Sequence, residues 1–202
     1  RTKIIIGLIF ILPFVGYSQG EFNIWYFGNK AGLDFNTVPP ITLLNSAMNI
    51  PPNATVSISD SLGNLLFYSD GYSVWNRTHV KMPNGLGLIG NGNNSQPVYA
   101  VKKLNENSVI IFFIKAQVPA QFGLFYSIID MQLDGGLGDI PPGSKNIPVI
   151  GAESAQDKLH GTRHYNNKYV WIVTRLYGQN KYASFLISEN GISSPVLSSS
   201  MV

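Results

Sequence analysis

One stretch, residues 54–76, constrains the fold more than any other part of the chain. It reads ATVSISDSLGNLLFYSDGYSVWN, and its apolar and polar residues alternate over Val56–Ser59. A period of two is typical of a strand with one buried face. Turn residues follow at 60–64 and at 69–71, where Asp caps a turn and Gly or Asn adopts positive φ. The stretch therefore predicts a three-stranded antiparallel meander.

The middle strand of this meander is apolar on both faces. Its residues 65–68 read LLFY, and a strand of that kind is covered from both sides. A small sheet with two apolar faces is not stable alone, so it needs similar sheets stacked against it. The pattern thus predicts a repeat-built, all-β domain.

Looser versions of the pattern follow twice, so we expect meanders near 54–76, 96–131 and 158–198. The strands expected in the later two are 97–102, 109–114, 122–131, 159–165, 169–176, 181–187 and a last one beginning near Ile192. Six consecutive apolar residues, 109–114, predict a strand that is buried on both faces. Shorter strands are expected at 22–27, 33–35 and 41–44, and residues 79–95 and 132–157 are expected to be loops.

Repeated meanders with long connections favour a β-propeller-like stack of about three blades, with a β-sandwich as the alternative. Twenty Gly and twelve Pro suit many turns and few helices. Because propellers close with four to eight blades, we expect residues 19–202 to be a partial propeller, an incomplete ring at the N-terminus of a longer chain.

The first 18 residues predict a signal peptide, expected to form a helix. Arg1 and Lys3 form a positive n-region, 4–15 an apolar h-region, and small residues precede a predicted cleavage between Ser18 and Gln19. The protein is therefore expected to be exported, to the extracellular space or the outer cell surface, and to meet a membrane only through this peptide. The alternative is a buried helix or a membrane anchor, for which the apolar run is short.

Six motifs are specific enough to indicate a family. They are residues 23–36 (NIWYFGNKAGLDFN), 58–71 (ISDSLGNLLFYSDG), 74–76 (VWN), 82–87 (MPNGLG), 126–131 (YSIIDM) and 133–139 (LDGGLGD). Together they resemble the N-terminal domain of large Bacteroidetes surface proteins that use type IX secretion and are often called gliding-motility-associated. The resemblance implies a propeller-like domain at the front of a multidomain surface protein, and it brings no catalytic residues.

Charge and cysteine content exclude several partners. Removal of Arg1 and Lys3 lowers the net charge from +3 to +1, and no basic stripe remains to hold a phosphate backbone, so nucleic acid is not expected as a partner. Cysteine is absent, which excludes disulfides and thiolate metal sites.

The most polar cluster on an expected strand is His160, Arg163 and His164, which we take as weak candidates for binding on an inner strand. Alternation sends His160, Thr162 and His164 to one face. Residues four apart on a strand are roughly 13 Å apart, too far to share one zinc ion with bonds of about 2 Å. We therefore expect hydrogen-bonded histidines near a propeller channel and no metal site.

No catalytic set emerges from the remaining motifs. Acidic residues fall at turns, and 134–139 (DGGLGD) lacks the alternating oxygen ligands of a calcium loop, so no cofactor is expected and calcium is the alternative. Trp25, Trp75 and Trp171 are expected to lie in the core. The sequence thus predicts a non-enzymatic module for adhesion or interaction, whose partner is a protein or glycan at the cell surface. A polysaccharide-acting hydrolase or lyase is the alternative, because two carboxylates need only meet in space.

Overall fold

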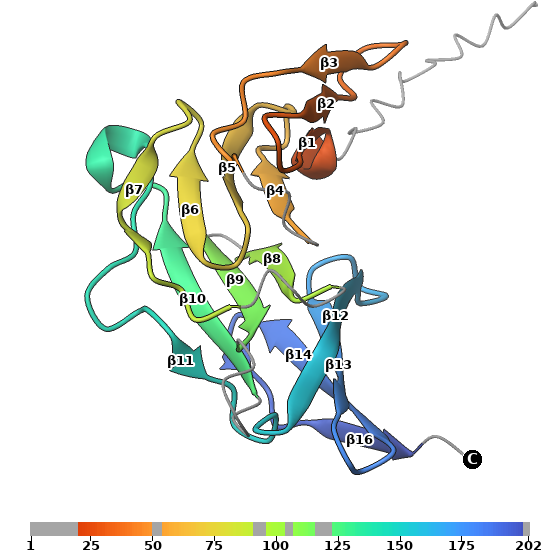
Figure 1. The fold of residues 1–202 in the computed structure, drawn as a ribbon. Helices are drawn as coiled ribbons and strands as arrows, with labels where there is room; N and C mark the ends of the chain where they lie inside the picture. Colours follow the sequence, from red (N-terminus) through yellow and green to blue (C-terminus); the bar gives the residue numbers. More distant parts are fainter. Residues whose placement is uncertain (1–19, 50–53, 91–95, 104–106, 116–122, 200–202) are drawn as a thin grey trace, which may run out of the picture.

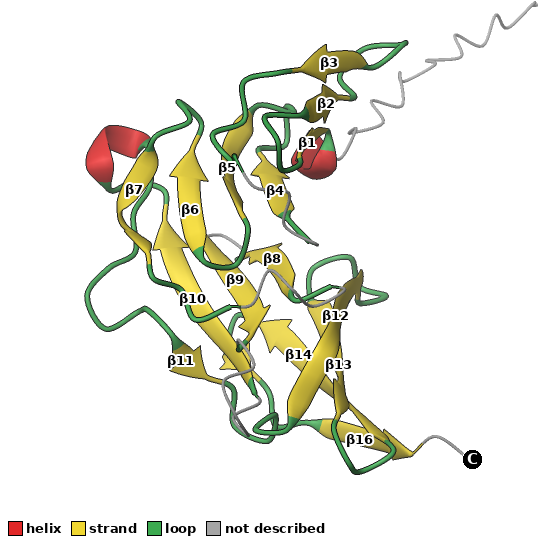
Figure 2. Cartoon of the chain, viewed as in Figure 1, coloured by secondary structure: helices red, strands yellow, loops and turns green. Residues whose placement is uncertain are grey.

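The computed structural model describes residues 20–49, 54–90, 96–103, 107–115 and 123–199 of the 202-residue chain. Antiparallel strands make up almost all of its regular structure, and two short 3-10 helices, η1 (Gly20–Phe22) and η2 (Asp134–Gly136), complete it (Figure 2). No helix in these ranges is long and apolar enough to cross a bilayer. The predicted signal peptide, with its cleavage between Ser18 and Gln19, lies outside the described residues.

The strands form four sheets that follow one another along the chain (Figure 1). The first sheet contains β1 (Ile24–Tyr26), β2 (Gly32–Asp34) and β3 (Ile41–Leu43). The second contains β4 (Val56–Ser59), β5 (Leu65–Ser69), β6 (Ser73–Asn76) and β7 (Lys81–Leu86). The third contains β8 (Val98–Lys102), β9 (Ser108–Ile114), β10 (Leu124–Asp130) and β11 (Ile147–Pro148). The fourth contains β12 (Ala155–Arg163), β13 (Val170–Leu176), β14 (Lys181–Ser188), β15 (Gly191–Ile192) and β16 (Val196–Ser199).

The all-β prediction is confirmed, and the three expected meanders correspond to the second, third and fourth sheets. The first sheet, over 24–43, is a further antiparallel unit that the sequence showed only as separate short strands. Two strands inside expected loops were missed, β7 and β11. Both are edge strands that contain a proline, Pro83 and Pro148, and proline lacks the N–H that a central strand needs.

Strand β9 is buried on both faces, as its six apolar residues predict. Val109, Ile111 and Phe113 face a core shared with the second sheet, while Ile110, Phe112 and Ile114 face a core shared with the fourth. All six side chains are 3% exposed or less. Burial of one apolar side chain stabilises the fold by about 1.5–3 kcal/mol, so the side chains of β9 stabilise the contacts of the third sheet with both of its neighbours.

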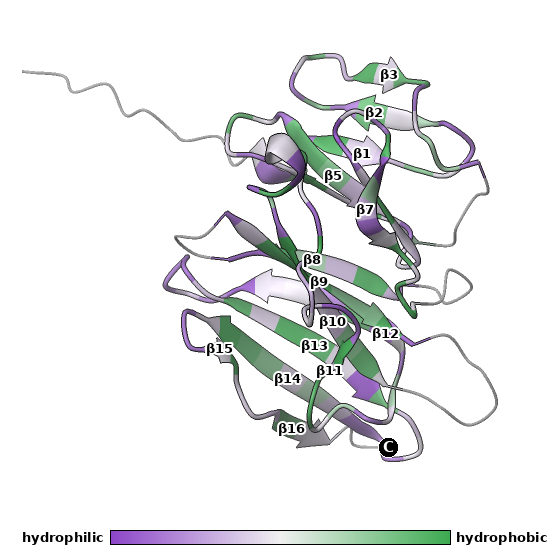
Figure 3. Ribbon diagram, turned by 90° about the vertical axis from the view of Figure 1, so that its left-hand side faces the viewer, coloured by the Kyte–Doolittle hydropathy of each residue, from purple (hydrophilic) through white to green (hydrophobic). Residues whose placement is uncertain are grey.

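Each interface between consecutive sheets has its own core. Ile24, Tyr26, Tyr68 and Trp75 pack between the first and second sheets, with Met48 beside them. The second and third sheets, and the third and fourth, enclose the two larger cores, so the sheets stack in chain order rather than as two facing sheets. Long hydrophobic stretches run along the strands of the third and fourth sheets (Figure 3).

The opening strands of the four sheets lie next to one another. Strand β1 contacts β4, β4 contacts β8, and β8 contacts β12. Where β8 begins, Gln96 forms a parallel bridge with Lys158 of β12, and the N–H of Leu159 donates to the Gln96 carbonyl over 3.0 Å. This seam places the ends of β8 and β12 side by side.

A polar clamp ties the second sheet to the third on the outer side of the stack. The backbone N–H and side-chain amide of Asn84 donate to the two carboxylate oxygens of Asp139, over 2.8 and 2.7 Å. Next to it, Lys145 donates to the carbonyl of Asn84 over 3.0 Å. Asp139, the last residue of the LDGGLGD motif, thus contributes to sheet stacking.

Candidate functional site

The three residues that the sequence singled out do not converge. Leu159 and Gly161 of β12 are buried, whereas His160 is exposed, as alternation along a strand requires. Arg163 lines a groove, but His160 and His164 do not line it. The groove therefore contains one of the three candidates, and the expectation of hydrogen-bonded histidines near a propeller channel stays a prediction.

Each histidine is held by aromatic neighbours instead. The His160 ring lies edge-on to Tyr99, with 5.8 Å between centroids. The ring centroids of His164 and Tyr165 are 4.3 Å apart, and Nδ1 of His164 accepts a hydrogen bond from the Asn166 N–H over 3.3 Å. These contacts position the histidines as parts of the surface of the fourth sheet.

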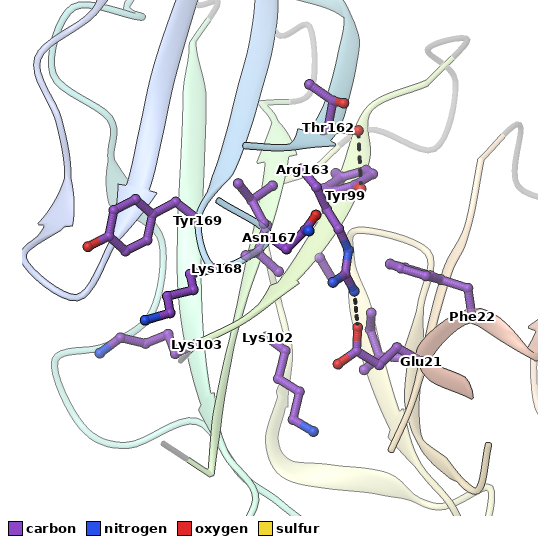
Figure 4. A pocket seen from close by; sticks show the side chains of 15 residues that line it. Glu21, Phe22, Tyr99, Lys102, Lys103, Thr162, Arg163, Asn167, Lys168 and Tyr169 are labelled. Atoms are coloured by element: carbon purple, nitrogen blue, oxygen red, sulfur yellow. Dashed lines mark hydrogen bonds and ion pairs between the residues drawn. The ribbon is translucent and has the colours of Figure 1, made fainter. Parts of the chain in front are cut away.

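The groove lies at the ends of the opening strands and has a volume of about 550 Å³. It is bounded by Glu21 and Phe22 of η1, by Ile58 of β4, by residues 99–103 of β8 and its end, and by 161–163 and 167–170 around the β12–β13 turn (Figure 4). Ile58, Ala100 and Val101 are buried, which gives the groove an apolar floor. Its size falls within the range of small-molecule sites. We call this feature the groove.

Cationic side chains dominate its rim. Lys102, Lys103, Arg163 and Lys168 line it, together with one carboxylate, Glu21. Arg163 Nη2 lies 2.7 Å from Glu21 Oε2, and the pair joins residues 142 positions apart in the sequence. Lys103 and Lys168 extend toward the same side of the groove in Figure 4, away from the Arg163–Glu21 pair.

Aromatic side chains complete the walls. Tyr99 donates its hydroxyl to the carbonyl of Gly161 over 3.3 Å, and burial raises the pKa of Tyr99. Phe22 is 43% exposed beside the groove. The hydroxyl of Tyr169 donates to Glu189 over 3.3 Å, and the nearby carboxylate raises the pKa of Tyr169. Both tyrosines are therefore neutral hydrogen-bonding groups near neutral pH.

The lining offers binding groups rather than a catalytic or metal-holding set. Retaining and inverting glycosidases use two carboxylates, and Glu21 is the one carboxylate among the described residues that line the groove. Across the described ranges, no group of three or more His, Cys, Asp or Glu side chains is placed to hold a metal ion. In the 134–139 motif, both oxygens of Asp139 already accept from Asn84.

Two other surface features are distinct from the groove, although Lys103 lines both the groove and the first of them. A cavity of about 400 Å³ between the third and fourth sheets is lined largely by apolar residues such as Ile110, Tyr126 and Ile192. On the outer face of the first sheet, the ring centroids of Trp25 and Phe35 are 5.0 Å apart, and Trp25 is 48% exposed. The prediction that Trp25 lies in the core is therefore wrong. Trp75, at 7% exposed, is in the core as predicted.

Sequence reasoning found one groove residue, Arg163, and missed the rest of the cationic rim. Lys102 and Lys103 are adjacent, but Lys168 is far from them in the chain, and the three form no basic stripe in the sequence. One sequence feature pointed to this rim, since Lys102 and Arg163 are the last residues of the opening strands of their sheets. Adjacent parallel strands bring such ends together, which the sequence alone does not reveal.

Comparisons of the chain with protein-family models, with curated proteins and with solved structures found no match.

Proposed function

We propose that this protein is an exported, non-enzymatic interaction module that binds a partner at the cell surface through the groove. The observation that carries the proposal is the groove itself, which combines an apolar floor with a cationic rim. Pockets of this size with a few converging polar groups are the usual place for a ligand. Adhesion is the role that fits a surface module of this kind.

The architecture that we propose is a partial β-propeller. Its support is the sheet order, in which antiparallel sheets follow one another and each packs on the next. The opening strands adjoin one another, and the bridge between Gln96 and Lys158 is parallel, which suits innermost strands around an axis. On this reading the groove lies near the mouth of the central channel.

Export rests on the pattern of residues 1–18 and on the family resemblance. Mass spectrometry of the protein secreted by a bacterial host tests it. The mature chain is expected to begin at Gln19, and retention of Arg1 in the exported product would contradict the proposed processing.

A polysaccharide-acting hydrolase or lyase is the alternative that the sequence leaves open. Among the described residues that line the groove, Glu21 is the single carboxylate, and it is paired with Arg163. This composition favours binding over hydrolysis, which uses two carboxylates. Incubation of the protein with a panel of polysaccharides tests this point. New reducing ends or unsaturated products would overturn the non-enzymatic proposal.

The binding role is tested by filling the groove. Thr162 lines it and is exposed, so Thr162→Trp is expected to abolish binding whatever the chemistry of the ligand. A matched control, Thr42→Trp, places the same bulk on an exposed position of β3. Wild type and both variants are compared on a glycan array and in pulldowns with bacterial surface proteins. Absence of wild-type binding, or equal binding by the Thr162→Trp variant, would reject the proposal.

A further inference from the structure

The cations of the groove surround an apolar floor, an arrangement that suits a ligand with both an apolar body and negative charge. Ile58, Ala100 and Val101 are 4% exposed or less, while Lys102 and Lys168 are exposed at the rim. Within the described residues no ion pair holds either of these two lysines, although Asp60 interacts electrostatically with Lys102. Surface charges arranged in this way attract anions and raise their association rate.

Neutral hydrogen-bonding groups stand among the cations. Thr162 and Asn167 line the groove, and each can both donate and accept hydrogen bonds. Phe22 offers a partly exposed ring, on which the C–H face of a sugar can pack. A sugar chain carries the matching hydroxyls at its edges and C–H groups on its faces.

Arg163 is already bound to a carboxylate, that of Glu21. The side chains are 38% and 24% exposed, so the pair is partly open to water. Exposed ion pairs add little stability, about a fivefold preference at most, so an external anion can replace Glu21 at small cost. The planar guanidinium also matches carboxylate and sulfate groups in a two-point contact.

We infer that the groove binds an oligosaccharide bearing carboxylate or sulfate groups, and that Glu21 occupies Arg163 until an anionic group of the ligand displaces it. The inference rests on the proposed binding role and names the ligand class. Glu21 then acts as an internal competitor that lowers affinity. Removing its charge makes Arg163 available to the ligand.

Isothermal titration calorimetry with defined probes tests the ligand class. The probes are tetragalacturonate for carboxylates, a κ-carrageenan tetrasaccharide, which carries sulfates and no carboxylates, for sulfates, cellotetraose as the neutral sugar and a tetraglutamate peptide as the acidic non-sugar. The acidic sugars are expected to bind, and the affinity is expected to fall when salt rises from about 20 mM to about 300 mM, because screening weakens exposed charges. The acidic sugar that binds with the higher affinity shows whether the groove prefers carboxylate or sulfate groups.

Three charge variants test the residues. Glu21→Gln is expected to tighten binding by about threefold to fivefold, the strength of an exposed pair. Arg163→Gln is expected to weaken it by about tenfold or more, as for a lost hydrogen bond to a charged group. Lys168→Gln, in an exposed turn, is expected to weaken it by about threefold.

Matched controls carry the same charge changes away from the groove. Glu153→Gln and Lys181→Gln remove one carboxylate and one ammonium from positions that do not line it, and both are expected to leave the affinity unchanged. Thermal melts verify that each variant is folded. If Arg163→Gln alone fails to fold, Lys168→Gln and the double variant Glu21→Gln/Arg163→Gln, which removes both partners of the pair, replace it.

The outcomes separate this inference from the proposed function. Equal binding of cellotetraose, binding of tetraglutamate alone, or weaker binding by Glu21→Gln would overturn the inference. In each of these cases, the proposed binding role would remain supported if Thr162→Trp abolished the binding that is observed. The proposed ligand class would also be overturned if no probe bound while the array showed ligands whose binding Thr162→Trp abolishes. Failure of the probes and of the array together rejects both.

Discussion

At the scale of single residues, the hydroxyl of Thr174 is a buried polar group without compensation. The side chain is 1% exposed, and its Oγ1 has no hydrogen-bond partner in the described part of the chain. An unpaired buried polar group costs about 1–3 kcal/mol. Thr174→Val keeps the shape and removes the hydroxyl, so we expect it to raise the free energy of unfolding by about 1 kcal/mol, measured by urea denaturation.

The matched control for this change is Thr55→Val, where the same hydroxyl is used. Thr55 Oγ1 donates to the carbonyl of Tyr26 over 2.7 Å, linking the first sheet to the segment before β4. Its loss is expected to lower the free energy of unfolding by about 1 kcal/mol. Effects of the same sign in both variants would show that hydrogen bonding is not what distinguishes them.

His79 makes the first interface sensitive to pH. The amide of Asn45 donates to Nε2 over 2.8 Å, and Nδ1 lies 3.2 Å from the Tyr68 hydroxyl. Burial lowers the pKa of His79 below its usual 6.5, so in the acid range the unfolded chain binds more protons than the folded one. The contribution of His79 to stability is therefore full above about pH 6.5 and is lost as the pH falls through the lowered pKa. We expect the melting temperature to fall between about pH 7.5 and pH 5.5, beyond the effect of the other groups.

Variants of two histidines isolate this effect. His79→Asn tolerates the positive φ of 64° at this position and removes the titrating ring, so its melting temperature should depend less on pH over the same range. His160→Asn changes an exposed ring and should retain the wild-type dependence. An unchanged pH dependence in His79→Asn would assign the effect to another group.

At the scale of elements, the seam between β8 and β12 depends on a glycine. A Cβ at Gly161 would overlap the ring of Tyr99, whose hydroxyl donates to the Gly161 carbonyl. Gly161→Ala is therefore expected to displace the ring and to destabilise the fold by about 1–3 kcal/mol, the usual cost of overpacking. Urea denaturation measures the loss.

A double-mutant cycle identifies the cause. In a Tyr99→Ala background the same Gly161→Ala change should cost little, because the obstructing ring is gone. A full cost in both backgrounds would place the strain in the backbone rather than at Tyr99. The cycle also reports on the groove, since both residues line it.

The elements that the sequence predicted best are those whose pattern is set by burial. Strand β9 is apolar at every position from 109 to 114 because its two faces lie in two different cores. The edge strands β7 and β11 were missed because edges tolerate Pro83 and Pro148, which are loop signals elsewhere. The groove was mostly missed for a different reason. Its cations come from strand ends far apart in the chain, and only the stacking of β4, β8 and β12 gathers them.

At the scale of the whole molecule, the sheets are joined in series through the hydrophobic cores between them. The third sheet buries one face against the second and the other against the fourth, and the second is covered by the first. In stacked repeats, stability is a sum of units and interfaces, and large interfaces make neighbours unfold together. A cavity in one core should therefore lower the stability of sheets that do not touch it.

Phe112→Ala tests this coupling with a reporter two interfaces away. Phe112 is fully buried in the core between the third and fourth sheets, whereas Trp75 packs on Tyr68, 5.5 Å between centroids, beneath the first sheet. With Trp25 and Trp171 replaced by Phe, fluorescence reports Trp75 alone. The substitution is expected to cost about 3–5 kcal/mol and to shift the urea transition of Trp75 together with that of circular dichroism. Ile150→Ala, at a side chain 84% exposed, is the control that should shift neither. If the Trp75 transition stays in place while circular dichroism moves, the sheets unfold separately, and the interfaces are too weak to join them into one cooperative unit.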